Sequence, residues 1–266
     1  MNKSITATYT YNKPVSEQVL SIIMPVYNEE KTVVTVLERI RSTELVHRTK
    51  KEVIVVDDCS SDKTGHVIKS YKLANPDLNI KYFEHQKNKG KGAALHTGIQ
   101  QATGDLLTIQ DADLEYDPND FNKLLEPVVT GQADVVYGSR FHGGNEPGVF
   151  GSWHAFGNKF LTRLSNLFTG LRLTDMETCY KLFPTKLIKK MTLKEQRFGF
   201  EPEITARIAK ISGIRVQEVG ISYVARKYVD GKKIGWRDGL RAIYVIFKYG
   251  LFIRKDNQLK ADHPNA

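Results

Sequence analysis

From residue 19 onward, short apolar runs alternate with longer segments whose apolar residues recur at helical spacing. This alternation is typical of β-α-β units wound around a largely parallel sheet, and it therefore predicts an α/β fold. The predicted strands are 19–25, 53–57, 80–83, 106–111 and 135–138, and the predicted helices between them are 30–41, 64–73, 92–102 and 119–129. A mostly parallel central sheet flanked by helices is the expected architecture.

The pattern changes after residue 138. A glycine-rich loop over 143–151 precedes an amphipathic run that contains Phe156 and Phe160. The predicted elements after that run are a strand at 179–183, a helix at 202–211, a strand pair at 215–219 and 222–225, and an amphipathic helix at 236–253. We therefore divide the chain into a polar N-terminal extension (1–18), one catalytic α/β domain (19–235), and a basic amphipathic C-terminal helix with its tail (236–266).

The charge of the chain is positive and local. Its formal net charge is +9, and residues 221–260 hold ten basic and three acidic side chains. Such a patch indicates an anionic partner. Nucleic acid is not the expected one, because the chain has no zinc-finger, RRM or basic-zipper pattern. Cys59 and Cys179 have no disulfide or zinc-ligand spacing, and the first residues lack an apolar signal region, so we expect a cytoplasmic protein.

Carboxylates follow three of the predicted strands. Glu29 comes after the first strand, Asp57 and Asp58 close the second, and Asp111 and Asp113 close the fourth. Ligands of open α/β sheets bind beyond the carboxyl ends of the strands, so these side chains are expected to converge. On an extended strand end, residues two apart point to the same side, so Asp111 and Asp113 can grip one cation. Oxygen ligands favour Mg²⁺ or Mn²⁺.

Four ordered motifs carry a resemblance to a known family. They are SIIMPVYNEE at 21–30, VVDDCSSDKT at 55–64, NKGKG at 88–92 and QDAD at 110–113. Together they resemble the GT-A fold of family 2 glycosyltransferases. Further segments, YGSRF at 137–141, 175–183, FGFE at 198–201 and 219–235, resemble the dolichyl-phosphate or polyprenyl-phosphate mannosyltransferase branch.

The resemblance implies roles residue by residue. The positions that it places around the donor nucleotide sugar are Pro25, Tyr27, Glu29, Asp57, Asp58, Lys89, Gly90 and Asp111. It gives the metal to Asp111 and Asp113, with Glu115 as a further ligand position. Arg140, Arg226 and Lys232 match cationic positions near the donor and acceptor phosphates, and Lys233 could substitute for its neighbour.

The expected reaction is an inverting transfer of a hexose from a nucleotide sugar to polyprenyl phosphate. Mg²⁺ or Mn²⁺ would neutralise the departing diphosphate as a Lewis acid. Mannose from GDP-mannose is favoured, and UDP-glucose or another UDP-hexose is the alternative donor. A phosphate acceptor is already ionised and needs no base. A glycan hydroxyl would need one, and Asp175 is then the candidate base, with Glu177 second.

The C-terminal helix has two interpretations. Leu240, Tyr244, Phe247 and Leu251 share one face beside several basic residues, which is typical of a helix lying on a membrane surface. A final helix packed on the core has the same periodicity. With polyprenyl phosphate as acceptor, we expect peripheral association with the cytosolic face of a membrane. The sequence sets no oligomeric state.

Overall fold

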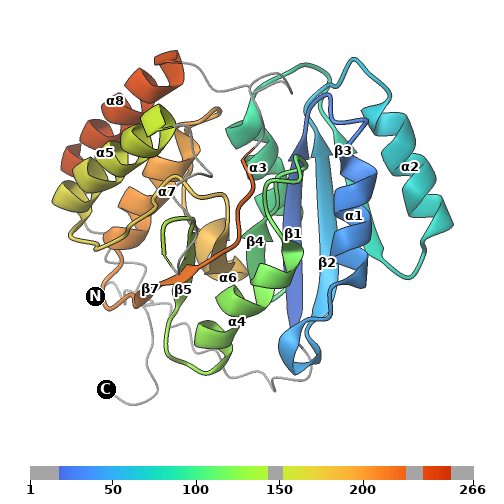
Figure 1. Cartoon of the computed structure of the whole chain (residues 1–266), viewed down its shortest axis with the longest axis horizontal. Helices are drawn as coiled ribbons and strands as arrows, with labels where there is room; N and C mark the ends of the chain where they lie inside the picture. Colours follow the sequence, from blue (N-terminus) through green and yellow to red (C-terminus); the bar gives the residue numbers. More distant parts are fainter. Residues whose placement is uncertain (1–17, 143–151, 226–235, 253–266) are drawn as a thin grey trace, which may run out of the picture.

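The computed structural model describes residues 18–142, 152–225 and 236–252 of the 266-residue chain (Figure 1). Most of the predicted N-terminal extension, the glycine-rich loop, Arg226, Lys232, Lys233 and the C-terminal tail lie outside these ranges.

A seven-stranded sheet forms the centre of the molecule, in the order β3-β2-β1-β4-β6-β5-β7. Its strands are β1 (Val19–Val26), β2 (Lys50–Asp57), β3 (Asn79–Glu84), β4 (Leu106–Ile109), β5 (Val135–Ser139), β6 (Lys181–Pro184) and β7 (Val216–Gly220). All neighbouring strands pair in parallel except that β6 runs antiparallel to both β4 and β5. The α/β fold with a mostly parallel sheet that the sequence predicts is therefore confirmed.

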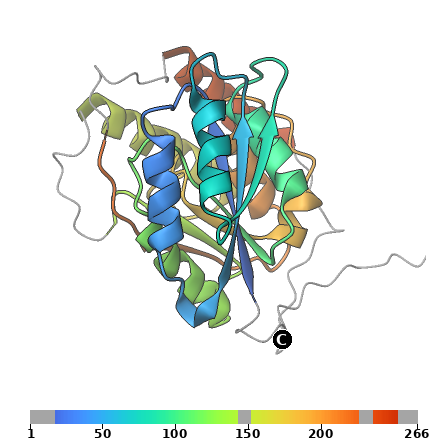
Figure 2. The same ribbon diagram turned by 90° about the vertical axis from the view of Figure 1, so that its right-hand side faces the viewer.

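Helices cover both faces of the sheet. They are α1 (Val33–Ser42), α2 (Thr64–Ala74), α3 (Lys91–Gln101), α4 (Phe121–Val129), α5 (Ser152–Thr169), α6 (Thr185–Lys189), α7 (Phe200–Ala209) and α8 (Trp236–Phe252), with short 3-10 turns at Val46–Arg48 and Pro118–Asp120. The connections through α1 and α2 step outward from β1 to β3, whereas α3 returns the chain to β4. Right-handed crossovers therefore put α3 on the opposite face, as Figure 2 shows.

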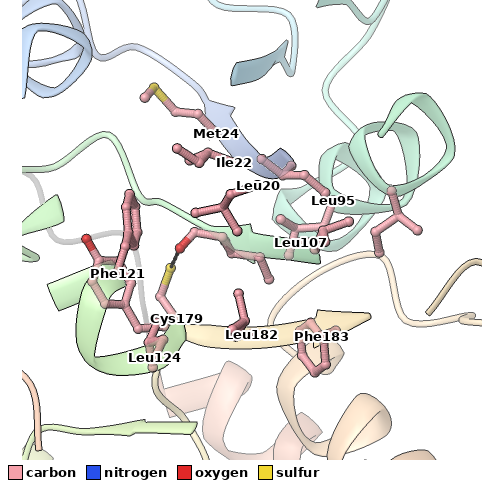
Figure 3. Packing of buried hydrophobic residues seen from close by; sticks show 14 of the residues in the cluster. Leu20, Ile22, Met24, Leu95, Leu107, Phe121, Leu124, Cys179, Leu182 and Phe183 are labelled. Carbon is pink, nitrogen blue, oxygen red and sulfur yellow. Dashed lines mark hydrogen bonds between the residues drawn. The ribbon is translucent and has the colours of Figure 1, made fainter. Parts of the chain in front are cut away.

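The core lies between β1, β4 and β6 and the helices that cover them. Figure 3 shows Leu20, Ile22 and Leu107 packed with Leu182 and Phe183, and these side chains have no exposed surface. Strands buried on both faces read as continuous apolar runs, which is why β1 and β4 are visible in the sequence.

Two predicted strands end or pair differently in the structure. The strand at 106–111 ends at Ile109, so Asp111 and Asp113 lie in the turn that follows it and not on an extended strand. The predicted strand at 215–219 is present as β7, but its predicted pairing with 222–225 is wrong. β7 pairs in parallel with β5, and Tyr223 forms only an isolated bridge with Tyr116. The pairing partner of β7 is distant in sequence, which local periodicity does not reveal.

Helix α8 has two apolar faces. Ala242, Val245 and Tyr249 are buried, and α8 contacts both α5 and α7. Leu240 and Leu251 are more than half exposed on the same helix. The helix is thus packed on the domain along one face and presents apolar side chains along another. None of the helices within the described ranges combines the length and apolar character that a membrane span needs.

Buried Glu52 joins three segments at the amino ends of the central strands. Its carboxylate accepts hydrogen bonds from Ser21 Oγ at 2.5 Å, Lys81 Nζ at 2.5 Å, and the amide of Thr103 at 2.9 Å. Burial acts to raise the pKa of Glu52, but the hydrogen bonds from Lys81, Ser21 and Thr103 prevail and lower the pKa to about 2. The charged form is therefore the one that the folded chain holds.

We expect Glu52→Gln to lower the free energy of unfolding at pH 7 by about 2 kcal/mol, because the hydrogen bonds to a charged acceptor are weakened. The pKa of Glu52 is lower in the folded chain than its ordinary value of 4.5. Its contribution to stability is therefore complete above about pH 4.5 and is lost as pH falls toward 2. Urea denaturation at several pH values measures both effects. Glu44→Gln, at an exposed position, is the control, and equal stability of the two variants would contradict the assignment.

Candidate active site

The turns after β1 and β2 are hydrogen-bonded to each other. The amide of Asn28 donates to Ser60 Oγ at 2.9 Å, and Asn28 Oδ1 accepts from the amide of Ser61 at 2.8 Å. The amide of Glu29 donates to Thr64 Oγ1 at 2.8 Å, and the Glu29 carboxylate accepts from Thr32. These contacts bring two of the three acidic strand ends together as one rigid edge, with Pro25 and Tyr27 half-buried on the first of them.

Asp57 and Asp58 are both buried, and the carboxylate of each accepts hydrogen bonds from backbone or side-chain groups. Asp57 accepts from Tyr82 Oη at 3.0 Å and from the amide of Ser60 at 2.9 Å. Asp58 receives the amides of Lys89 at 3.0 Å and Gly90 at 2.6 Å, and His85 Nδ1 lies 2.7 Å from it. Asp58 therefore fixes the turn at 89–90, where Gly90 has a φ of +95° that favours glycine.

Three carboxylates lie in the turn after β4. They belong to Asp111, Asp113 and Glu115, and the turn contains Leu114 in the left-handed region, at a φ of +65°. Burial, together with the nearby charges of Asp111 and Glu115, raises the pKa of Asp113 to about 8. Like charges held this close need a cation to coexist in the ionised form.

One cation is supplied by the chain itself. Lys91, the first residue of α3, places its Nζ 2.7 Å from Oδ1 and 2.8 Å from Oδ2 of Asp111. Burial acts to lower the pKa of Lys91, but the charge of Asp111 outweighs it and raises that pKa. Sequence reasoning named Lys89 and Gly90 and missed Lys91. The available signal was its position between two glycines at the start of a predicted helix.

The donor set of this turn fits a hard divalent cation. Asp111 and Asp113 offer carboxylate oxygens two residues apart, and the mutual repulsion of these groups favours cation binding. Glu115 accepts from Tyr223 Oη at 2.7 Å through its Oε2, and its charge acts on Asp113. Within the described ranges, no three His, Cys, Asp or Glu side chains are grouped in a way that could hold a metal. A diphosphate and water would supply further oxygen ligands to such a cation.

Arg140 and Asp175 form a buried ion pair. Asp175 Oδ2 accepts from Arg140 Nε at 2.6 Å and from its amide at 3.0 Å, and Oδ1 accepts from Nη2 at 2.8 Å. Asp175 has no exposed surface. Both of its oxygens are thus engaged by a guanidinium group, an arrangement that favours a role in holding Arg140 over one as a general base. Its role in this geometry is to orient Arg140, whose guanidinium also lies over the ring of Tyr223.

A second buried polar cluster adjoins the β4 turn. Lys181 Nζ contacts Glu201 and the carbonyl of Thr178. Burial and the charge of Glu201 raise the pKa of Glu177 to about 7, and no described residue offers a hydrogen bond to its buried Oε1. Because β6 runs antiparallel to β4, residues 175–180 enter the site from the amino end of β6. Lys181 and Glu201 had no functional role assigned from the sequence.

Solved structures of similar architecture identify the fold. Glucosyl-3-phosphoglycerate synthase from Mycobacterium tuberculosis, in complex with Mn²⁺, UDP and phosphoglyceric acid, superposes with a TM-score of 0.67 at 17% identity, over 94% of this chain and 88% of that one. Its complex with Mn²⁺, UDP and glucosyl-3-phosphoglycerate gives 0.64 at 16% identity, over 87% and 80%. The fold is that of the GT-A glycosyltransferases.

Comparison of the sequence with family models identifies the family. Residues 21–192 match the model of glycosyl transferase family 2. The chain therefore belongs to glycosyl transferase family 2 and is a glycosyltransferase, as its sequence motifs predict.

Three curated relatives are named for a polyprenyl or dolichyl phosphate and a sugar. Undecaprenyl-phosphate mannosyltransferase of Micrococcus luteus is 30% identical over 89% of this chain and 96% of its own length. Dodecaprenyl-phosphate galacturonate synthase of Rhizobium johnstonii is 29% identical over 91% and 70%. Dolichyl-phosphate beta-glucosyltransferase of Dictyostelium discoideum is 27% identical over 83% and 70%. The sugars in the three names differ, whereas the type of lipid phosphate is shared.

We expect Asp113→Asn to weaken Mn²⁺ binding by at least about tenfold, since losing even an outer partner of a metal ligand typically weakens affinity by that much. Electron paramagnetic resonance of Mn²⁺, with UDP or GDP present, measures the bound fraction directly. Asp117→Asn is the matched control, because Asp117 caps the 3-10 turn that begins at Pro118. Undiminished Mn²⁺ binding by the Asp113 variant would remove this carboxylate from the metal site.

Proposed function

We propose that the chain transfers a hexose from a nucleotide sugar to polyprenyl phosphate, with inversion at the anomeric carbon and with help from Mg²⁺ or Mn²⁺. The observation that carries the proposal is the carboxylate turn after β4, where Asp113 lies beside Asp111 and Glu115. The polyprenyl-phosphate acceptors in the names of the relatives support the acceptor class.

The donor side follows from the strand-end turns. The edge that Asn28 and Ser60 tie together would receive the nucleoside, with Pro25, Tyr27, Glu29 and Asp57 around it. Asp58 holds the turn of Lys89 and Gly90, whose position at the start of α3 suits a phosphate. Asp111 and Asp113 would hold the metal ion, which as a Lewis acid stabilises the charge that develops on the departing diphosphate.

The acceptor side follows from charge. A polyprenyl phosphate oxygen is already ionised near neutral pH, so the protein needs to bring two anions together and does not need to remove a proton. Arg140 is oriented for this work by its bidentate pairing with Asp175. That pairing also neutralises part of its charge, so we assign the remaining compensation to Arg226 and Lys232, with Lys233 as a substitute.

For the sugar we propose mannose, carried by GDP. The resemblance of the motifs favours the mannosyltransferase branch, and the Micrococcus luteus relative, a mannosyltransferase, aligns over 96% of its own length. UDP-glucose or another UDP-hexose is the alternative donor. Its support is the glucosyltransferase and galacturonate synthase among the relatives.

A glycan hydroxyl remains a second candidate acceptor because of Glu177. With Asp175 bound to Arg140, Glu177 is the other carboxylate named from the sequence as a base. Its pKa of about 7 suits proton removal near neutral pH.

The acceptor class is tested by offering undecaprenyl phosphate and undecaprenol side by side, each with GDP-mannose, UDP-glucose and Mn²⁺. We expect a sugar phospholipid from the phosphate and no product from the alcohol, because a phosphate oxygen is already ionised whereas a hydroxyl must first lose its proton. Mass spectrometry of the lipid extract identifies the product and the sugar. Glu177→Gln should retain at least about a tenth of the wild-type rate with the phosphate, since a general base typically contributes a hundredfold or more. If the wild-type protein transfers the sugar to the alcohol and Glu177→Gln abolishes that transfer, the hydroxyl reaction is established instead.

The membrane surface that we propose as the site of action is formed by α5 and α8. The two helices lie side by side, and Phe168 meets Phe247 edge to face with ring centroids 5.1 Å apart (Figure 1). Their exposed apolar side chains are Phe156, Phe160, Leu167, Leu240, Tyr244, Phe247, Leu251 and Phe252. The basic excess of residues 221–260 complements anionic headgroups on the cytosolic leaflet. An anionic bilayer is therefore the occupant that this surface fits.

We expect Phe156→Glu and Leu240→Glu each to reduce flotation with phosphatidylglycerol vesicles by about threefold or more, because each change places a charge where an apolar side chain enters the interface. Phe156 is 66% exposed and Leu240 57% exposed, so neither change should disturb folding. Leu73→Glu is the control, since Leu73 is 83% exposed on α2, away from this surface. Equal loss of binding in all three variants would contradict the placement.

A further inference from the structure

We propose that Glu195 is a positioning residue, which ties α8 to the segment 89–93 at the start of α3 and thereby sets the affinity for the donor nucleotide. The inference rests on the proposed donor role of that segment. Residues 194–199 lie between the two elements, and Glu195 is 4% exposed.

The side chain of Glu195 is held by α8. Its Oε2 accepts from Arg241 Nη2 at 2.7 Å and from Nε at 3.1 Å, and Oε1 accepts from Lys248 Nζ at 3.2 Å and Tyr249 Oη at 3.3 Å. Burial acts to raise the pKa of Glu195, but hydrogen bonds from Arg241 and Lys248 prevail and lower it. One buried carboxylate is thus bound by three side chains of a single helix.

The backbone around Glu195 is fixed as well. Its amide donates to Glu203 Oε2 of α7 at 2.7 Å, and the amide of Lys194 donates to the same oxygen at 2.8 Å. A Cβ on Gly199 would approach Glu195 Oε2 to 2.8 Å, so the chain closes tightly over the carboxylate. The side chain of Glu195 is thus anchored to α8, and its backbone to α7.

The other side of this segment presses on the start of α3. The amide of Ala93 donates to the carbonyl of Gln196 at 2.9 Å. A Cβ on Gly92 would lie 2.4 Å from the carbonyl oxygen of Glu195, and one on Gly90 would lie 2.7 Å from that of Gln196. Backbone packs on backbone at Gly92, and at Gly90 the side chain of Arg197 joins the backbone contact, with its Cγ 2.9 Å from where a Cβ would lie. A shift of Glu195 is therefore passed directly to residues 90–93.

The same few residues reach the donor site. The amides of Lys89 and Gly90 donate to Asp58, and Lys91 pairs with Asp111. A loosened 194–199 segment would free the start of α3, and Lys91 with it. The nucleotide would then have to order this segment on binding, which lowers its affinity.

The test uses Glu195→Gln, Arg241→Gln and the double variant of the full chain, with Arg39→Gln on α1 as the matched control at an exposed arginine. Amide hydrogen exchange of the peptide spanning 89–97, without nucleotide, reads the tie itself. Titration calorimetry with GDP and UDP in the presence of Mn²⁺ reads its effect on the donor site. Turnover at saturating donor separates positioning from general damage.

We expect faster exchange at Ala93 and roughly three- to tenfold weaker nucleotide binding in both single variants, within the range of measured couplings through packed contacts. The double variant should be no weaker than the weaker single variant, because both break one link. The KM for the donor should rise while kcat changes by less than about twofold. The control should match the wild-type protein in each measurement.

If hydrogen exchange at 89–97 is unchanged in Glu195→Gln, the proposed link between α8 and the start of α3 is wrong, whatever the donor is. Additive losses of nucleotide affinity in the double variant would overturn it as well. If the wild-type protein binds neither GDP nor UDP while the variants exchange faster, the proposed donor fails and the structural tie stands. The two proposals therefore fail in different measurements.

Discussion

Repulsion between carboxylates gathered at one edge of the sheet is the constraint on which the site depends. A parallel sheet brings its strand ends together whatever side chains they carry, and here the turns after β1, β2 and β4 are all acidic. The chain offsets most of this charge with its own donors. Asp58 receives backbone amides and Asp111 receives Lys91. Asp113 accepts a hydrogen bond from the amide of Glu115, but burial and the charges of Asp111 and Glu115 outweigh it and raise the pKa of Asp113. A divalent cation on a diphosphate would offset this repulsion, which is why the proposed chemistry and the electrostatics of the turn agree.

The sequence predicts the parts of this arrangement that local pattern encodes. Apolar runs mark β1 and β2 because strands covered on both faces need apolar residues throughout. The motifs at 21–30 and 110–113 indicate the family because they stand in the chain in the order that the family's motifs have. Two features depend on contacts that no local pattern contains. Asp175 looks like a free acid in the sequence, and only the tertiary fold places Arg140 on it. Lys91 looks like one more surface lysine near a helix start, and only the packing of α3 on β1 and β2 brings it to Asp111.

Amphipathicity left α8 with two interpretations, and the structure shows why pattern alone could not separate them. The helix is apolar around more of its circumference than a core contact requires. Val245 and Tyr249 are buried against the domain, while Leu240 and Leu251 are exposed to solvent. Arg241 and Lys248 lie between these faces and bind Glu195, so basic residues that the sequence assigns to a headgroup interface also serve an internal contact. Counting charged and apolar residues along one helix does not distinguish residues that face a membrane from residues that make an internal contact.

The direction of β6 has a consequence for how such a chain can diversify. At the edge of the sheet that carries the candidate active site, the other strands are each followed by the residues that lie there. Strand β6 runs in the opposite direction between β4 and β5, so the residues that precede it lie at that edge. Residues 175–180 are therefore the end of a connection and not the start of one. The antiparallel pairs Leu106 with Pro184 and Thr108 with Leu182 lie further along the strand than this stretch. A substitution at Glu177 therefore leaves these pairs in place, whereas Tyr180 is tied to β5 through its carbonyl, which accepts from the amide of Gly138.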